Sequence, residues 1–142
     1  MELLVPSERE VIWVVGKDGN EGKTWFQKYL KSYFGSIRTF NSSIGNSSNG
    51  LLHALSKHLL PLIDVFIFNI PKCFPETKVP YDLFENLKDG EAISSKYDSR
   101  TLTFKTPNIV IIFSNKSPDR IKMSCDRWKI FNIEKRELIE DK

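Results

Sequence analysis

The segment Gly16–Thr24 places the strongest constraint on how this chain can fold. It follows a short apolar run, Val11–Val15, and ends in Gly22-Lys23-Thr24, where a helical pattern begins. A strand that leads through a glycine-rich loop into Gly-Lys-Thr and a helix is the layout of a phosphate-binding loop. In such a loop, backbone N–H groups and the helix N-terminus hold phosphate oxygens, and glycines keep side chains out of their way. The segment therefore predicts nucleotide binding at the end of the first strand.

Each residue of this loop has an expected role. Lys23 reaches the phosphate oxygens, and the Thr24 hydroxyl ligates Mg²⁺. The spacing differs from the usual pattern, because Lys17 stands five positions before Gly22 and the first glycine, Gly16, comes one residue earlier. The alternative is a Gly/Asn turn followed by an ordinary helix. The residues that we expect to line the bound nucleotide are Gly19, Asn20, Glu21, Gly22, Lys23 and Thr24.

Length and composition favour one globular domain in an intracellular protein. The chain has 142 residues, of which 40% are hydrophobic and 27% charged, enough for a sizeable core. The net charge of +3 suits a nucleic-acid partner and a soluble enzyme equally, so it decides little. Cys73 and Cys125 lack the spacing of a metal site, and we interpret them as reduced thiols. No apolar run approaches the length of a membrane-spanning helix, so we expect no membrane partner.

Apolar runs separated by helical patterns predict the order of the elements. Strands are expected at Val11–Val15, Ser36–Phe40, Leu62–Ile70, Asn108–Phe113 and Trp128–Ile133. Helices are expected at Thr24–Phe34, Leu51–Leu60 and Pro80–Gly90, a hairpin within Glu91–Phe104, and a loop at Asn41–Gly50. We place the domain at residues 10–133, after the end of a linker at 1–9 and before a charged tail at 134–142 that we expect to fray.

The predicted strands meet at one candidate site. Continuous apolar strands that alternate with helices predict an α/β fold with a mainly parallel five-stranded sheet covered on both faces. Ligands of such sheets bind at the carboxyl ends of the strands. Gly16, Asn69 and Asn115 all lie at such ends. Their convergence predicts one site better than any of them alone.

The motifs after the loop indicate the class of nucleotide-binding protein. Asn115–Asp119 misses the Asn-Lys-x-Asp spacing of a GTPase by one residue. As a set, the motifs resemble the superfamily 3 helicase domain of Rep proteins from circular single-stranded DNA viruses, and the loop is most similar to the nanovirus and alphasatellite group. The segments that carry the resemblance, in order from Arg9 to Ile133, are Ile12–Thr24 (Walker A), Phe66–Lys72 (Walker B), Asn86–Gly90 with Ser95–Ser99 (B′), Ile111–Asn115 (motif C) and Asp126–Trp128.

The resemblance implies an ATP-driven 3′-to-5′ DNA helicase of the AAA+ type, with a P-loop fold and a β-hairpin insertion. It implies rolling-circle replication of viral DNA in the host nucleus by a ring, commonly a hexamer. ATP and Mg²⁺ would lie between neighbouring subunits, with Asn115 orienting the attacking water near the γ-phosphate. An arginine from the neighbouring subunit stabilises the transferring phosphoryl group in such rings. Arg127 is the favoured candidate and Arg120 the other, unless Arg127 forms an ion pair with Asp126 or Glu134.

The resemblance also implies that the hairpin lines a channel around single-stranded DNA. Lys96 would contact DNA phosphates without reading sequence, and Tyr97 would stack on a base or merely pack. Lys88 is a further DNA-binding candidate. The alternative for Lys88 and Lys96 is a solvated surface lysine.

Asn69 departs from the resemblance, because Rep proteins usually carry the Walker B aspartate there. A carboxamide has no charge to offer Mg²⁺, and Asp64 lies on the opposite face of the strand at its far end. We favour the hypothesis that Thr24 and the phosphates hold Mg²⁺, that Asn69 positions metal-bound water, and that slow hydrolysis remains. The other hypothesis is a module that binds nucleotide and assembles on DNA but hydrolyses ATP poorly.

Further alternatives stay open at this point. One is a superfamily 3 helicase of RNA-virus or parvovirus type, against which the Asn-x-x-Lys-Asp-Gly and Lys-Tyr-Asp-Ser runs weigh. A nucleoside kinase is weaker, since no arginine-rich lid segment is present. Neither the His-hydrophobe-His nor the Tyr-x-x-Lys motif of a Rep endonuclease precedes the loop, so we expect an excised helicase domain. Ring assembly would then need more of the parent protein.

Overall fold

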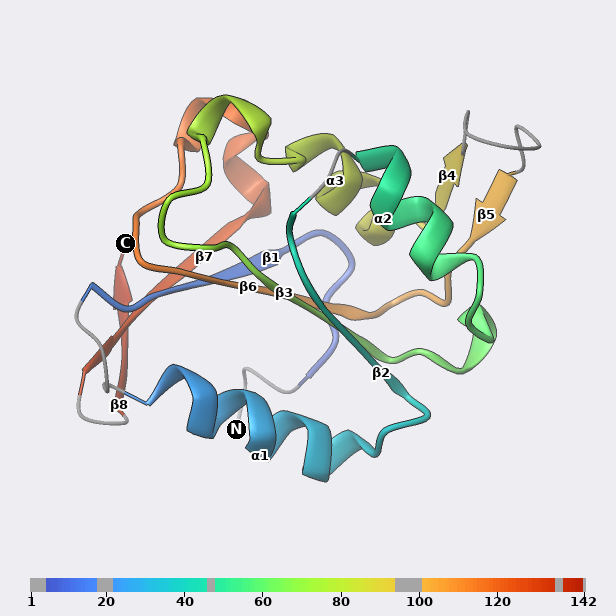
Figure 1. Ribbon diagram of the computed structural model, residues 1–142, viewed down its shortest axis with the longest axis horizontal. Helices are drawn as coiled ribbons and strands as arrows, with labels where there is room; N and C mark the ends of the chain where they lie inside the picture. Colours follow the sequence, from blue (N-terminus) through green and yellow to red (C-terminus); the bar gives the residue numbers. More distant parts are fainter. Residues whose placement is uncertain (1–4, 18–21, 46–47, 94–100, 135–136, 142) are drawn as a thin grey trace.

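A mainly parallel sheet forms the centre of the molecule (Figure 1). The computed structural model describes residues 5–17, 22–45, 48–93, 101–134 and 137–141. Within these ranges the sheet has six strands in the order β2-β3-β6-β1-β7-β8, of which the first five are parallel and β8 is antiparallel to β7. The strands are β1 (Val11–Val15), β2 (Thr39–Ser43), β3 (Val65–Asn69), β6 (Ile109–Ser114), β7 (Trp128–Glu134) and β8 (Glu137–Asp141). The predicted α/β fold is confirmed, with one strand added.

Helices cover both faces of this sheet (Figure 1). The helix α1 (Lys23–Phe34) lies on one face, and α2 (Ser48–Leu55) and α3 (Tyr81–Asp89) lie on the other. The predicted hairpin is present as β4 (Glu91–Ile93) and β5 (Thr101–Thr103), which follow α3. Short 3₁₀ helices occur at Leu60–Leu62, Glu76–Lys78, Arg120–Lys122 and Cys125–Arg127. In the described ranges, no helix has both the length and the apolar character needed to cross a membrane.

The two core clusters follow from the alternation of side chains along buried strands. In β1, Ile12 and Val14 pack with Phe26 and Leu30 of α1. Trp13 belongs to the other cluster, which contains the apolar residues of α2, α3 and the hairpin. A strand buried on both faces reads as an unbroken apolar run, which is why β1, β3 and β6 were predictable from the sequence.

Polar segments of the chain are more ordered than expected. The predicted loop over Asn41–Gly50 is wrong at both ends, because β2 continues to Ser43 and α2 begins at Ser48. Backbone pairing with β3, such as Asn41 opposite Ile67, outweighs the low strand propensity of these polar residues. The helix expected to reach Leu60 ends at Leu55.

Both peripheral segments of the chain are attached to the sheet. Ser7 forms an antiparallel bridge with Asn108, although we interpreted residues 1–9 as a linker. The expectation of a frayed tail is wrong for Glu137–Asp141, which pair with β7 as β8. Leu138 of β8 packs against the α1 side of the core, so the hairpin with β7 buries apolar surface as well as pairing backbone groups.

Substitution of Gly90 tests the backbone geometry between the end of α3 and the start of β4. It ends α3 in the left-handed region with φ 93°, and a Cβ added there would lie 3.0 Å from Thr106 Cγ2. We expect Gly90→Ala to cost about 1–2 kcal/mol of unfolding free energy, because an L side chain is strained at this φ. Gly45→Ala is the matched control, since an added Cβ meets nothing within 4 Å there. Equal losses of Tm in the two variants would contradict this expectation.

Candidate functional site

The carboxyl ends of β1, β6 and β3 lie side by side at one edge of the sheet. The strand β6 lies between the other two, with Val15 opposite Ser114 and Asn69 opposite Phe113. The pairing continues past the strand ends, since Gly16 N donates to Ser114 O and Ile70 N donates to Phe113 O, each at 2.9 Å. The predicted convergence of Gly16, Asn69 and Asn115 is confirmed.

The phosphate loop enters α1 through a glycine in the left-handed region. Gly22 has φ 110° and ψ 10°, and Phe26 N donates to Gly22 O at 2.9 Å as the helix begins. The first turn of α1 contains no acidic residue, so none of its own side chains opposes the positive end of the helix dipole. Lys23 Nζ donates to Gly16 O at 3.2 Å, which places its charge beside the end of β1. These features fit an anionic phosphate group. Gly19, Asn20 and Glu21 lie outside the described residues.

The residues expected near Mg²⁺, Thr24 and Asn69, carry no charge. Thr24 is exposed on the first turn of α1 and can offer its hydroxyl to Mg²⁺. At the end of β3, the Asn69 carboxamide is neutral and bonds to Gln27 of α1, with Gln27 Nε2 donating to Asn69 Oδ1 at 2.6 Å. The described part of the chain holds no group of three His, Cys, Asp or Glu side chains that could bind a metal. The residues present therefore fit Mg²⁺ that is held mainly by phosphate oxygens and Thr24.

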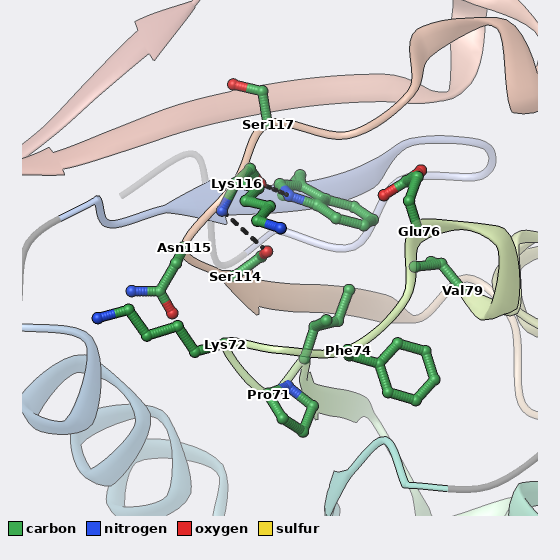
Figure 2. A pocket seen from close by; sticks show the side chains of 11 residues that line it. Pro71, Lys72, Phe74, Glu76, Val79, Ser114, Asn115, Lys116 and Ser117 are labelled. Carbon is green, nitrogen blue, oxygen red and sulfur yellow. Dashed lines mark hydrogen bonds between the residues drawn. The ribbon is translucent and has the colours of Figure 1, made fainter.

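Asn115 follows β6 in a turn that the core holds in place. The indole Nε1 of Trp13 donates to Lys116 O at 3.1 Å, and Lys116 N donates to Ser114 Oγ at 3.1 Å. Figure 2 shows this turn beside a small hollow that opens to solvent and is lined also by Pro71, Phe74 and Val79. Because both bonds fix the backbone on either side of Asn115, its carboxamide is presented from a defined position.

Lys72 is a site residue that our reasoning from the sequence missed as a functional group. It lies three residues after Asn69 and lines the same hollow as Asn115, and Figure 2 shows the polar ends of both side chains on the same side of it. The Lys72 side chain is exposed. Its position at the end of the Walker B segment was the available signal. Lys72 adds a positive charge beside Asn115 (Figure 2).

Tyr81 joins the two loops that border the hollow. Its hydroxyl donates to Glu76 Oε1 at 2.5 Å and accepts from Asp119 N at 3.1 Å. Burial and then the Glu76 bond raise the pKa of Tyr81 well above its ordinary value, so the phenol stays protonated as a donor. Glu76 follows β3 and Asp119 follows β6, so this one side chain sets the spacing of both loops.

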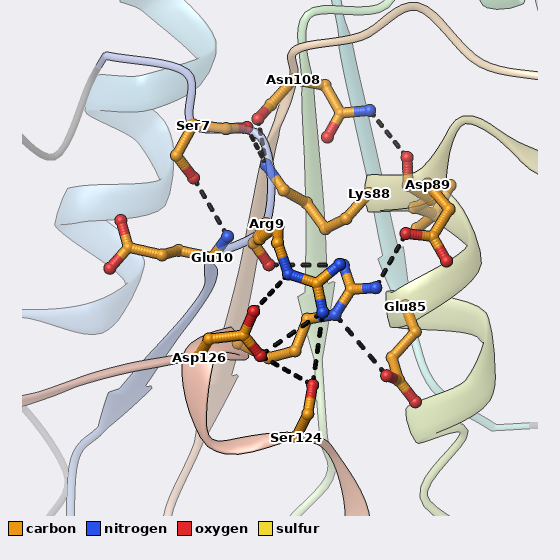
Figure 3. A network of polar contacts seen from close by, with 11 residues as sticks. Ser7, Arg9, Glu10, Glu85, Lys88, Asp89, Asn108, Ser124 and Asp126 are labelled. Carbon is orange, nitrogen blue, oxygen red and sulfur yellow. Dashed lines mark hydrogen bonds and ion pairs between the residues drawn. The ribbon is translucent and has the colours of Figure 1, made fainter.

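Arg127 does not fit the role of an arginine that reaches a neighbouring subunit. Its side chain is buried, and Nη2 donates to Asp89 Oδ1 at 2.7 Å while Nε lies 3.5 Å from Glu85 Oε2. Figure 3 shows Glu85 and Asp89 presenting their carboxylates from α3. The expected ion pair with Asp126 or Glu134 is also wrong, because Asp126 pairs with Arg9 instead. The physical reason is the i, i+4 spacing of Glu85 and Asp89, which puts both acids on one helix face.

Lys88 is not an exposed DNA contact. Only 4% of the residue is exposed, and its Nζ donates to Ser7 O at 2.7 Å and to Asn108 O, as Figure 3 shows. Burial, with a smaller contribution from the Arg127 charge, lowers the pKa of Lys88 from 10.5 to about 8. The ammonium group thus anchors the N-terminal segment to α3 and β6. The other DNA-binding candidates, Lys96 and Tyr97, lie outside the described residues.

The sequence is similar to curated proteins of alphasatellites. It is 37% identical over 128 residues to Para-Rep C7 of Faba bean necrotic yellows C7 alphasatellite and 36% identical over 126 residues to Para-Rep C10 of Milk vetch dwarf C10 alphasatellite. The matches cover 89% and 88% of this chain. This chain is a homologue of alphasatellite Rep proteins. It spans 43% and 42% of the lengths of these two relatives, and no protein-family model matches it.

A solved structure shares the fold. The A form apo structure of the NrS-1 C-terminal region superposes with a TM-score of 0.52 over 88% of this chain and 29% of that chain, at 14% sequence identity. At this identity the likeness concerns the fold alone. Together with the strand-loop-helix at Gly22, it confirms the predicted P-loop architecture for the Rep homologue.

The buried position of Arg127 can be tested by unfolding. We expect Arg127→Ala to cost about 2–3 kcal/mol, because it leaves Glu85 and Asp89 without their partner and removes buried packing. Arg120→Ala is the control, since the ion pair of Arg120 with Asp141 at 3.2 Å is exposed and its loss should change stability by less than about 0.5 kcal/mol. Urea unfolding measures both. Equal, small effects would contradict the assignment.

The lowered pKa of Lys88 predicts a pH dependence. The unfolded chain keeps the Lys88 proton up to 10.5, whereas the folded chain keeps it only up to about 8. Between these values the unfolded state binds more protons, so stability at this position rises with pH. We expect the unfolding free energy of wild type minus that of Lys88→Met to increase from pH 8 to pH 10, measured by urea unfolding. A difference that is flat or falls over this range would contradict it.

Proposed function

We propose that this chain is the ATP- and Mg²⁺-binding domain of a Rep helicase that acts in rolling-circle replication of single-stranded DNA. One observation carries the proposal: Lys23, Thr24 and Asn115 come from segments that meet at a single edge of a parallel sheet. The similarity to the Para-Reps supports a role in replication. The activity of the whole protein, including unwinding, is part of the proposal.

The residues of the site would divide the work as follows. Lys23, whose Nζ donates to the Gly16 carbonyl, would bind the charged phosphate oxygens, which make stronger hydrogen bonds with an ammonium than a carbonyl does. Thr24 ligates Mg²⁺, and Asn115 orients the attacking water. Lys72 offers a further cation to the phosphate charge. Bound ATP·Mg²⁺ supplies the phosphoryl group and the divalent charge.

Asn69 supports slow rather than fast hydrolysis. A neutral carboxamide stabilises metal-bound water by hydrogen bonds but adds no charge. The same observation keeps a second candidate function, a module that binds nucleotide and assembles on DNA with little or no hydrolysis. We favour the slow ATPase, because Thr24 and Asn115 remain available for chemistry.

DNA and subunit contacts complete the proposal. The strands β4 and β5 follow the end of α3, and the sequence between these two strands carries Lys96 and Tyr97 as candidates for contact with single-stranded DNA. Arg120 replaces Arg127 as the candidate for contact with a neighbouring subunit's nucleotide, because Arg120 is exposed. A ring, commonly a hexamer, and a location in the host nucleus follow from the resemblance to Rep proteins.

Nucleotide binding and ATP turnover test this assignment. Lys23→Ala should lose both, and Asn115→Ala should keep binding while turnover falls about 100-fold, since loss of a positioning group acts on the transition state. Lys72→Met should lower turnover about tenfold, whereas Lys78→Met, an exposed lysine of the 3₁₀ helix at Glu76–Lys78, should not. A nucleotide affinity of Lys23→Ala equal to wild type would overturn nucleotide binding at this loop.

Two further measurements separate the candidates in the same experiment. A wild-type turnover at the level of Lys23→Ala selects the assembly module over the ATPase. Addition of single-stranded DNA, with the solution mass recorded, tests the motor. Stimulation that Lys96→Ala abolishes supports the hairpin contact, and a monomer indifferent to DNA argues against a motor in this part of the protein.

A further inference from the structure

A reciprocal pair of amides connects α1 to the end of β3. Gln27 Nε2 donates to Asn69 Oδ1 at 2.6 Å, and Asn69 Nδ2 donates back to Gln27 Oε1 at 2.9 Å. Gln27 lies one helical turn after Lys23, so the two side chains project from the same face of α1. The pair therefore ties the helix of the phosphate loop to the position where a Walker B acid is expected.

Most of the hydrogen-bonding positions of the Asn69 carboxamide are occupied by protein partners. A primary amide has two donor hydrogens and two acceptor lone pairs. Asn69 Nδ2 donates to Gln27 and also to Asn41 Oδ1 at 3.3 Å, so both donors are engaged. One lone pair of Asn69 Oδ1 remains beyond the Gln27 bond.

We propose that Gln27 is a positioning residue that holds Asn69 as a neutral, single acceptor, and that this pair selects an amide over a carboxylate at position 69. The inference rests on the proposed nucleotide site for its effect on turnover. The remaining lone pair of Oδ1 accepts a hydrogen bond from water at the phosphate edge. Asn69 would then act through its hydrogen bonds with Gln27, and not as a substitute for the usual aspartate.

A carboxylate cannot replace the Asn69 amide in this pair. Gln27 presents one donor and one acceptor to position 69, and turning its amide over exchanges the two without removing either. An aspartate has only acceptors when ionised, so one of its oxygens would oppose an oxygen of Gln27 where the native N–H···O bond is 2.9 Å long. The substituted carboxylate would have to leave the native position of the side chain. Removal of the Gln27 acceptor should relieve this conflict.

A double-mutant cycle tests the pair without nucleotide. The variants are Asn69→Asp, Gln27→Met, which keeps the length of the side chain, and both together, compared by urea unfolding. We expect Asn69→Asp to lower the folding equilibrium constant about tenfold in the wild-type background and less than about threefold beside Gln27→Met. Lys28→Met, an exposed neighbour on α1, is the control and should leave the tenfold loss unchanged. Equal losses in all backgrounds would overturn the proposal.

ATP turnover gives the readout that a purely structural contact would not move. Asn69→Asp alone should lower kcat about five- to tenfold with KM for ATP within about twofold, because the misplaced side chain acts on positioning rather than binding. Gln27→Met should restore kcat in the Asn69→Asp background and lower the Mg²⁺ concentration needed for half-maximal rate, whereas Lys28→Met should do neither. A higher kcat for Asn69→Asp with native Gln27 would overturn the proposal.

The coupling of Gln27 to Asn69 and ATP hydrolysis at this site can be tested independently of each other. If every variant and the wild type turn over ATP only at the rate of Lys23→Ala, hydrolysis by this site is wrong. The unfolding cycle still decides whether Gln27 and Asn69 are coupled. Coupling without turnover would keep Gln27 as the residue that holds Asn69 in a nucleotide-binding module.

Discussion

The packing of Trp13 connects the core of this protein to its candidate site. Its ring stacks on Tyr81 with centroids 5.8 Å apart and meets Phe84 and Trp128 edge to face. Its indole N–H donates to Lys116 O, one residue past Asn115. Loss of such a buried ring costs about 3–5 kcal/mol in typical cores. The same side chain thus secures α3 to the sheet and holds the turn that presents Asn115.

The buried cations Lys88 and Arg127 bind groups of the protein itself and hold its segments together. Lys88 of α3 and Arg127, which directly precedes β7, both donate to backbone carbonyls of the N-terminal segment, and both are almost fully buried. Backbone carbonyls accept from Lys88, and two carboxylates one turn apart accept Arg127. A buried cation is tolerated only with such partners, because desolvation otherwise costs more than the attraction returns. Lys23, Lys72 and Lys116, by contrast, lie near the carboxyl ends of the strands.

Neutral amides and a glycine set the character of the site. Gly22 opens α1, and Asn69 and Asn115 stand where two further strands end. Such groups would orient water and phosphate oxygens by hydrogen bonds and themselves carry no negative charge. In the proposed nucleotide site, the lysines would supply the attraction for phosphate and the amides would orient water and phosphate oxygens.

The sequence by itself determined the parallel sheet, the phosphate loop and the convergence of three strand ends, because strands buried on both faces and a Gly-Lys-Thr helix start are local signals. It also determined the relationship to alphasatellite Rep proteins through the order of its motifs. Only the tertiary structure decided that β8 pairs with β7, that polar Asn41–Ser43 join the sheet, and that Arg127 and Lys88 lie inside. The tertiary structure also brings Gln27 to Asn69 and Lys72 to the hollow beside Asn115. Strand pairing, burial and amide contacts each depend on residues that are far apart in the chain. A local sequence pattern therefore cannot predict which of these residues will contact one another.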